Sequence, residues 1–277
     1  MCFTEMVSVK GLIYKSRGTE DLLETTSAEY IKAAQLFGDD PDIFVAAAKM
    51  KALENFDIVD LNFGCPVPKV FNNGEGSAML ARPELAEKIV SELVKSGKTV
   101  TAKFRMGIEK GDNVAVEFGK RLAGAGASML TLHARYKTDY YSGEPDYETC
   151  LKLKNAVCVP VIFNGGIFSS ADADAAMERS GADGVMLARG ALRSPWLICD
   201  ILGVPTPDKG ELIKKHFDMI CERRGESNAC RYFRKQMALY LKNVSGAKKL
   251  KEKIFAATTR EDYHAVIDEA FPSEDRR

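Results

Sequence analysis

One stretch decides the fold: residues 57–70, which read DIVDLNFGCPVPKV. Its first half, residues 57–62, predicts a buried strand, because it holds a short apolar run with two β-branched residues and is too brief for a helix. The glycine and prolines within residues 64–68 end that strand in a turn. Cys65 is therefore expected on a rigid loop just past the carboxyl end of a strand, with Asn62 beside it. Parallel α/β sheets and barrels hold their chemistry at that edge, so Cys65 is the candidate catalytic side chain.

Around this stretch, short apolar segments alternate with amphipathic ones along most of the chain. The expected strands span residues 30–36, 57–62, 99–104, 128–133, 159–164 and 184–187. Helices are expected at residues 42–53, 83–95, 113–125, 147–155, 171–180 and 191–202. This alternation predicts a parallel sheet with right-handed crossovers. So many units within about 200 residues favour a TIM-type (β/α)8 barrel over an open sheet.

The pattern changes after Pro205 and Pro207, where no further strand is expected. Helices are expected at residues 211–224, 228–242, 247–257 and 260–271. The sequence thus predicts two domains, a barrel over residues 1–205 and an all-helical domain over residues 208–277.

The helical domain concentrates positive charge although the whole chain has a net charge of zero. Residues 223–253 hold ten basic and two acidic side chains, which suggests a polyanion such as nucleic acid as partner. A solvated basic helix face is the alternative. Tyr232, Phe233 and Tyr240 stand among these charges, where they either stack on bases or belong to the core.

Composition excludes several classes of protein. The chain of 277 residues is 45% hydrophobic and 28% charged, as is usual for a soluble globular protein. No apolar run approaches the roughly 20 residues that span a bilayer, so no membrane association is expected. The seven cysteines form no Cys-x-x-Cys pair, which argues against a disulfide framework or a metal cluster and favours the reducing cytoplasm. We expect no metal, and a monomer.

Each expected strand ends on a polar side chain, whereas the strand interiors are mostly apolar. The six residues are Gln35, Asn62, Lys103, His133, Asn164 and Arg189. Any one of them alone would be read as a strand-end solvation residue. Together they predict one ligand-binding face at the mouth of the barrel.

Glycine-rich loops follow the last two expected strands and lead into helices. They read NGGI at residues 164–167 and ARGA at residues 188–191. Backbone N–H groups and a helix N-terminus at such loops favour an anion, and Arg189 can add a bidentate contact. A phosphorylated cofactor or substrate is therefore expected. Neither a Walker A loop nor a Gly-x-Gly-x-x-Gly motif follows a strand here, so a tightly held dinucleotide is not indicated.

Taken together and in this order, the motifs resemble those of the tRNA-dihydrouridine synthases. They read TEMV at 4–7, QLFG at 35–38, DLNFGCP at 60–66, KFR at 103–105, HAR at 133–135, NGGI at 164–167, GVMLARGA at 184–191 and YLK at 240–242. The resemblance covers nearly the whole chain.

The resemblance implies a flavin-dependent reductase that saturates the C5–C6 bond of uridine in tRNA. FMN would lie over the barrel mouth, be reduced by NADPH or NADH, and deliver hydride to C6. Cys65 would act as the general acid that protonates C5, a role that a thiol on a fixed loop can fill. The cationic helical domain would grip the RNA backbone while the target uridine leaves its stack.

The resemblance also implies roles for the polar residues, position by position. It assigns Gln35, Lys103 and His133 to the flavin ring. It assigns the FMN phosphate to Asn164, Gly165, Gly166, Ala188 and Arg189. Asn62 and Arg135 are expected to meet the uridine substrate.

The chain departs from the family pattern in three places. Gly166 stands where the family usually has an acidic residue, and Ala188 where it has a glycine, so weakened phosphate binding is expected. The family begins with an Ala-Pro-Met strand, a loop and a helix before the TEM segment, whereas Thr4 here follows Met1 by three residues. The first βα unit is thus expected to be missing, either because the chain starts at an internal methionine or because it is a degenerate member.

Two other functions remain open from the sequence. A different FMN-dependent barrel dehydrogenase would act on a free pyrimidine and would not need the basic helical domain. A redox-inactive protein that only binds tRNA is the second.

Overall fold

The computed structural model describes residues 1–273, and its contacts divide the chain into two compact units. The first unit comprises residues 1–166 and 174–186. The second comprises residues 167–173 and the described chain from Leu187 onward. This boundary lies before residues 205–208, where the sequence pattern changes.

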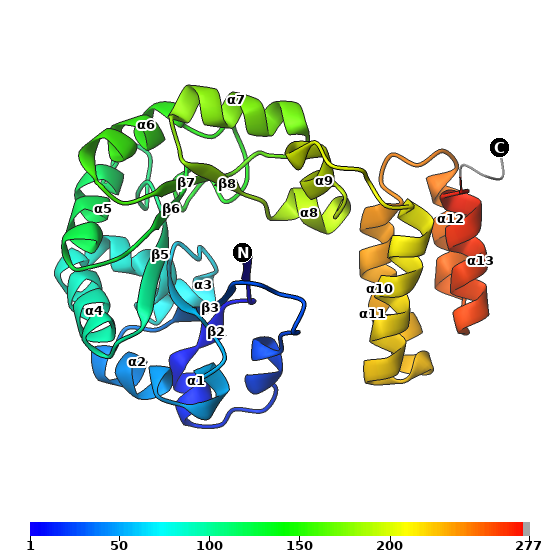
Figure 1. Ribbon diagram of the computed structural model, residues 1–277, viewed down its shortest axis with the longest axis horizontal. Coiled ribbons are helices and arrows are strands. Elements are labelled where there is room, and N and C mark those ends of the chain that lie inside the picture. The colour runs from blue at the N-terminus through cyan, green and yellow to red at the C-terminus, as the bar shows by residue number, and fades with distance from the viewer. Residues whose placement is uncertain (274–277) are drawn as a thin grey trace. The chain divides into compact units, whose positions relative to one another are not determined.

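The first unit is built on one parallel sheet that curls into a half-barrel (Figure 1). The strands follow one another across the sheet in the order β1, β3, β4, β5, β6, β7 and β8, and β2 also pairs with β3. Their bounds are β1 Cys2–Phe3, β2 Val7–Ser8, β3 Lys32–Phe37, β4 Ile58–Phe63, β5 Thr99–Arg105, β6 Leu130–His133, β7 Val161–Asn164 and β8 Gly184–Met186.

Most of the helices follow the outer side of this sheet (Figure 1). The α-helices are α1 Val9–Ile13, α2 Pro41–Ala48, α3 Pro68–Asn72, α4 Pro83–Lys95, α5 Ala115–Gly124, α6 Tyr147–Ala156 and α7 Ser170–Ser180. Three 3-10 helices are η1 Glu20–Leu23, η2 Lys51–Leu53 and η3 Gly76–Ala81.

In β4, β5 and β6, alternation along the strand separates an apolar outer face from a mostly polar inner one. In β4, Phe63 faces outward and its ring meets Phe118 of α5 at 5.9 Å, and Phe104 of β5 meets the same ring at 5.3 Å. Asp60 and Asn62 alternate with the outward-facing residues of β4 and point to the opposite face. The core of the unit therefore lies between the sheet and its helices, and polar side chains are left to line the concave face.

All six strands expected from the sequence are present, and they belong to one parallel sheet. Across residues 1–273 the strand pairing runs as an open path from β1 to β8, without a pair that joins those two edges. The sheet is therefore a curled half-barrel. The missing first βα unit stays a prediction.

Two expected helices are interrupted. Residues 42–53 form α2 to Ala48 and then the separate short helix η2, and residues 191–202 are divided between α8, Arg189–Arg193, and α9, Leu197–Leu202. Pro195 accounts for the second break, because proline lacks an N–H and disfavours a helical residue before it. The sequence pattern did not predict β1, β2 and α1, since the two strands are only two residues long and the helix only five.

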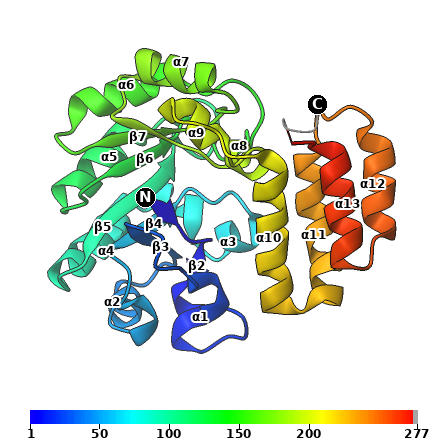
Figure 2. The ribbon, with the colours of Figure 1, turned by 45° about the vertical axis from the view of Figure 1, so that its right-hand side comes forward.

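In the second unit, four helices pack side by side around one apolar core (Figure 2). They are α10 Lys209–Arg224, α11 Glu226–Tyr240, α12 Ala247–Ala256 and α13 Arg260–Ala270. Phe217 and Tyr263 stack at the centre with ring centroids 4.2 Å apart, and Phe233 packs against both. Within residues 1–273, none of the helices combines enough length with enough apolar character to span a bilayer.

Candidate functional site

Cys65 lies on the loop that follows β4 and is only 7% exposed. The Asn62 side chain holds this loop from one side, since its Oδ1 accepts the backbone N–H of Gly64 at 3.1 Å and of Cys65 at 2.9 Å. Arg105 donates from Nε to the Gly64 carbonyl at 2.9 Å. The Ser77 hydroxyl donates to the Cys65 carbonyl at 2.9 Å. Donors and acceptors on both sides of the loop are thus fixed, as the turn residues predicted.

Gly76 lets the chain pass directly behind this loop. Its φ is +60°, a conformation that side chains with a Cβ rarely adopt. A Cβ there would also lie 2.9 Å from the Cys65 carbonyl oxygen. Glycine at this position is therefore required for Ser77 to reach Cys65.

A second group of polar residues lies deeper on the concave face of the sheet. Asp60 is fully buried, and its two carboxylate oxygens accept from the Thr101 hydroxyl at 2.6 Å and from Gln35 Nε2 at 2.7 Å. Gln35 Oε1 in turn accepts from Asn62 Nδ2 at 2.7 Å. Two of the predicted strand-end residues, Gln35 and Asn62, are thus in direct contact.

Lys103 stands beside Asn62 on one neighbouring strand and Thr131 on the other. Burial lowers the pKa of the Lys103 ammonium to about 8, although the negative charge of Asp60 opposes that shift. Among residues 1–273 the ammonium makes no hydrogen bond or ion pair, and the buried Thr131 hydroxyl likewise lacks a hydrogen-bond partner. Polar groups of this kind favour a ligand that brings hydrogen-bond acceptors.

The shifted pKa of Lys103 can be measured. Competitive acetylation, followed by mass spectrometry of the peptide that carries Lys103, should give a titration midpoint at about 8 instead of 10.5. Asp60→Asn should lower the midpoint further, because it removes the charge that favours the ammonium. Between these two pH values the unfolded chain binds the proton and the folded chain does not, so this group makes folding more favourable as pH rises. A midpoint near 10.5 would contradict the burial of the amine.

The pKa of the Cys65 thiol is raised, which keeps the thiol protonated. Burial raises its pKa, and the N–H of Val67 and the charges of Arg105 and Lys103 only partly offset that effect. The side chain is therefore a neutral thiol at pH 7, which is the form that can donate a proton.

The carboxyl ends of β6 and β7 bring further predicted residues together. His133 pairs in register with Asn164, and its Nε2 lies 3.3 Å from Arg135 Nη1. Arg135 is buried and also donates to the carbonyls of Ser142 at 3.0 Å and Gly143 at 2.7 Å. The guanidinium expected at the substrate thus holds a neighbouring loop in this structure.

The residues expected at a phosphate divide between the two units. Gly165 and Gly166 follow β7 in the first unit with φ values of +131° and +73°, which only glycine adopts readily. Ala188 and Arg189 belong to the second unit, where the Arg189 guanidinium lies 5.6 Å from the Phe168 ring. Their shared role at a phosphate stays a prediction.

Several site residues were not predicted from the sequence, because the prediction considered only the residues at the ends of strands. Asp60, Thr101 and Thr131 lie inside strands, and Ser77 lies in a 3-10 helix. The available signal was the alternation of polar with apolar residues in β4, β5 and β6, which marks a polar inner face.

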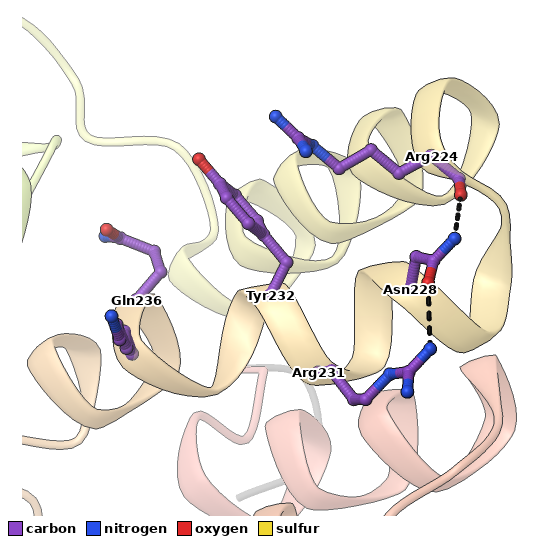
Figure 3. Close-up of a pocket in the computed structure, with 6 residues that line it drawn as sticks. Arg224, Asn228, Arg231, Tyr232 and Gln236 are labelled. Atoms are coloured by element: carbon purple, nitrogen blue, oxygen red, sulfur yellow. Dashed lines mark hydrogen bonds between the residues drawn. The ribbon is translucent and has the colours of Figure 1, made fainter.

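In the second unit, the helix α11 borders an open groove of about 870 Å³ (Figure 3). It is lined by Arg224, Asn228, Arg231, Tyr232, Lys235 and Gln236. The Arg224 guanidinium lies 4.2 Å from the centre of the Tyr232 ring, and both side chains extend to the same side. No acidic residue in the described part of the chain pairs with the three basic residues of this groove.

The three aromatic residues predicted near this surface have different environments. Tyr232 is 54% exposed, whereas Phe233 and Tyr240 belong to the apolar core of the helices. The sequence left open whether these residues stack on bases or belong to the core. Of the three, only Tyr232 is exposed enough to stack on a base. The described residues contain no group of three or more His, Cys, Asp or Glu side chains placed to hold a metal ion.

Comparison with known proteins finds one family over nearly the full length of the chain. The family model for dihydrouridine synthase (Dus) matches residues 1–275. A probable tRNA-dihydrouridine synthase 1 of Synechocystis sp. is 36% identical over 281 residues, which cover 98% of this chain and 79% of the relative. A probable tRNA-dihydrouridine synthase of Mycobacterium tuberculosis is 33% identical over 280 residues, which cover 95% and 72%. The chain belongs to the dihydrouridine synthase family.

Proposed function

We propose that this chain is a cytoplasmic tRNA-dihydrouridine synthase that uses FMN and NADPH or NADH to reduce the C5–C6 bond of uridine, with Cys65 as proton donor. The observation that carries this proposal is the fixed loop of Cys65 beside the unpaired Lys103 ammonium, in a chain of this family. All seven cysteines are free, which fits a reducing compartment.

The concave face offers groups that suit a flavin. Lys103 and Thr131 lie in register on adjacent strands with polar groups that lack protein partners among the described residues. A flavin ring carries carbonyl and nitrogen acceptors, so both groups would gain hydrogen bonds from it. His133 and the Gly165 and Gly166 backbone stand at the neighbouring strand ends, where His133 would also contact the flavin ring and the two glycines would hold the phosphate. When bound, FMN supplies the hydride chemistry that side chains lack.

The chain's own residues supply the proton and the setting for it. Cys65 holds its proton at Sγ at neutral pH, because burial raises its pKa. Asn62, Arg105 and Ser77 fix the backbone on either side of the thiol, so that Sγ stays in one place. Because the pKa of Lys103 is about 8, its side chain is mostly charged at neutral pH, and this charge would stabilise negative charge that develops on a ligand nearby.

The groove of α11 is proposed as part of the tRNA-binding surface. Arg224, Arg231 and Lys235 would neutralise phosphates, and Tyr232 would stack on a base or a ribose. Side chains that lack acidic partners can form such contacts without first breaking an ion pair.

The direct test is a reaction with unmodified tRNA. Purified protein is incubated with FMN, NADPH or NADH and tRNA transcribed in vitro, and nucleosides are then quantified by mass spectrometry. We expect dihydrouridine to form only when flavin and reductant are both present. Protein that binds tRNA tightly yet forms no dihydrouridine with either reductant would contradict the proposed activity. Formation of dihydrouracil from free uracil would favour the small-molecule alternative.

A further inference from the structure

Four hydrogen bonds connect the buried Asp60 carboxylate to the backbone of the Cys65 loop. Gln35 Nε2 donates to Asp60 Oδ2 at 2.7 Å, and Asn62 Nδ2 donates to Gln35 Oε1 at 2.7 Å. Asn62 Oδ1 then accepts the N–H groups of Gly64 and Cys65. Thr101 donates to the remaining Asp60 oxygen at 2.6 Å. We call this series, from Thr101 through Asp60, Gln35 and Asn62, the amide relay.

The loop end of the amide relay imposes a direction on it. The backbone N–H groups of the loop can only donate, so Asn62 must present its oxygen to them and its NH₂ to Gln35. Gln35 must then present its oxygen to Asn62 and its NH₂ to Asp60, whose Oδ2 accepts. A single arrangement therefore satisfies every group, and the loop N–H groups select it.

We propose that Asp60 is a positioning residue, which holds the Cys65 loop in place through the side chains of Gln35 and Asn62. The sequence predicted Gln35 at the flavin and Asn62 at the uridine, but the structure shows both amides engaged in the relay. This inference rests on the proposed function in one respect, because that function gives Cys65 a reaction to perform. The geometry of the loop itself requires neither flavin nor tRNA.

The directional character of the relay allows a specific rescue experiment. Asn62→Asp leaves the loop N–H groups satisfied but places a second carboxylate against Gln35, whose single NH₂ cannot serve both. The double variant Asp60→Asn with Asn62→Asp reverses the direction of the whole relay and keeps the net charge of the native protein. Gln35 then donates to position 62 and accepts from position 60, while the Thr101 hydroxyl still has a partner. If Asp60 only filled space, the substitution Asp60→Asn would not restore the Cys65 loop in the Asn62→Asp variant.

The readout is the rate at which iodoacetamide alkylates Cys65, followed by mass spectrometry of its peptide, with the exposed Cys158 as internal reference. Cys65 is buried, so its alkylation reports opening of the loop. We expect Asn62→Asp to raise the rate about tenfold, from the mismatch of buried polar groups. The double variant should return to within about threefold of the native rate. A double variant that reacts as fast as the single one, or faster, would overturn the proposal.

A second substitution keeps the test decisive if Asn62→Asp fails to fold. Gln35→Met removes the middle of the relay without any change of charge, and circular dichroism verifies the fold. Faster alkylation of Cys65 supports the proposal, whereas an unchanged rate contradicts it. Because alkylation is measured without flavin or tRNA, the predicted pattern in a protein that forms no dihydrouridine would reject the proposed function and leave the positioning role intact.

Discussion

Replacing Cys65 with alanine should lower the rate of dihydrouridine formation by about 10² to 10⁴, the usual contribution of a positioned general acid. The thiol is the only proton-donating side chain on a loop whose backbone is held by Asn62, Arg105 and Ser77 among the residues described. Burial raises the pKa of this thiol, so it is uncharged at neutral pH. The substitution therefore removes a proton donor and does not change the charge of the site. Single-turnover assays on unmodified tRNA, with mass spectrometry of the nucleosides, measure this change.

The matched control is Cys150→Ala on α6. Cys150 is as buried as Cys65 and lies in the same unit, so its replacement creates a cavity of similar size away from the loop. We expect this variant to retain native turnover, and both variants to bind tRNA with native affinity. A Cys65→Ala enzyme that keeps full turnover would refute the role of the thiol. A loss shared equally by both variants would assign the effect to stability.

Most of the sheet could be predicted because its strands carry strong local signals. Residues 58–63 are apolar on one face and end in glycine and proline, which set both the strand and its end. Closure of a barrel, in contrast, depends on which edges find each other, and no local pattern encodes that. The break at Pro195 carried a local signal that the amphipathic pattern of residues 191–202 obscured.

The candidate site could be predicted only in part, for a related reason. Strand-end residues such as Asn62 and Lys103 were found, because parallel strands bring their carboxyl ends to one edge. Which atoms those side chains contact depends on register, and register is a property of pairs of strands. Hydrogen bonds from Gln35 to both Asp60 and Asn62 therefore could not be read from any single segment. The same limit applies to the contacts of Arg135 with the Ser142 and Gly143 carbonyls, and its role at the substrate stays a prediction.

Reversing the charge of the α11 groove should weaken tRNA binding about a hundredfold at physiological salt. The variant combines Arg224→Glu, Arg231→Glu and Lys235→Glu, three side chains that line the groove. Each lost phosphate contact also removes counterion release, so the slope of log affinity against log salt should fall by about three. Tyr232→Ala should weaken binding by a smaller factor and leave the slope unchanged, because stacking on a base releases no counterion. Fluorescence anisotropy with labelled tRNA at several salt concentrations separates the two effects.

A matched variant distinguishes the groove from net charge. Lys88→Glu, Lys95→Glu and Lys120→Glu change the charge of the chain by the same amount but lie on exposed positions of α4 and α5, outside the sheet. If the groove binds RNA, this control should keep most of the affinity and of the salt slope, because its lysines contact no phosphate. Equal losses in the two triple variants would mean that tRNA senses only the overall charge, and would remove the groove from the binding surface. A groove variant with native affinity but lower turnover would instead indicate that these side chains orient bound tRNA.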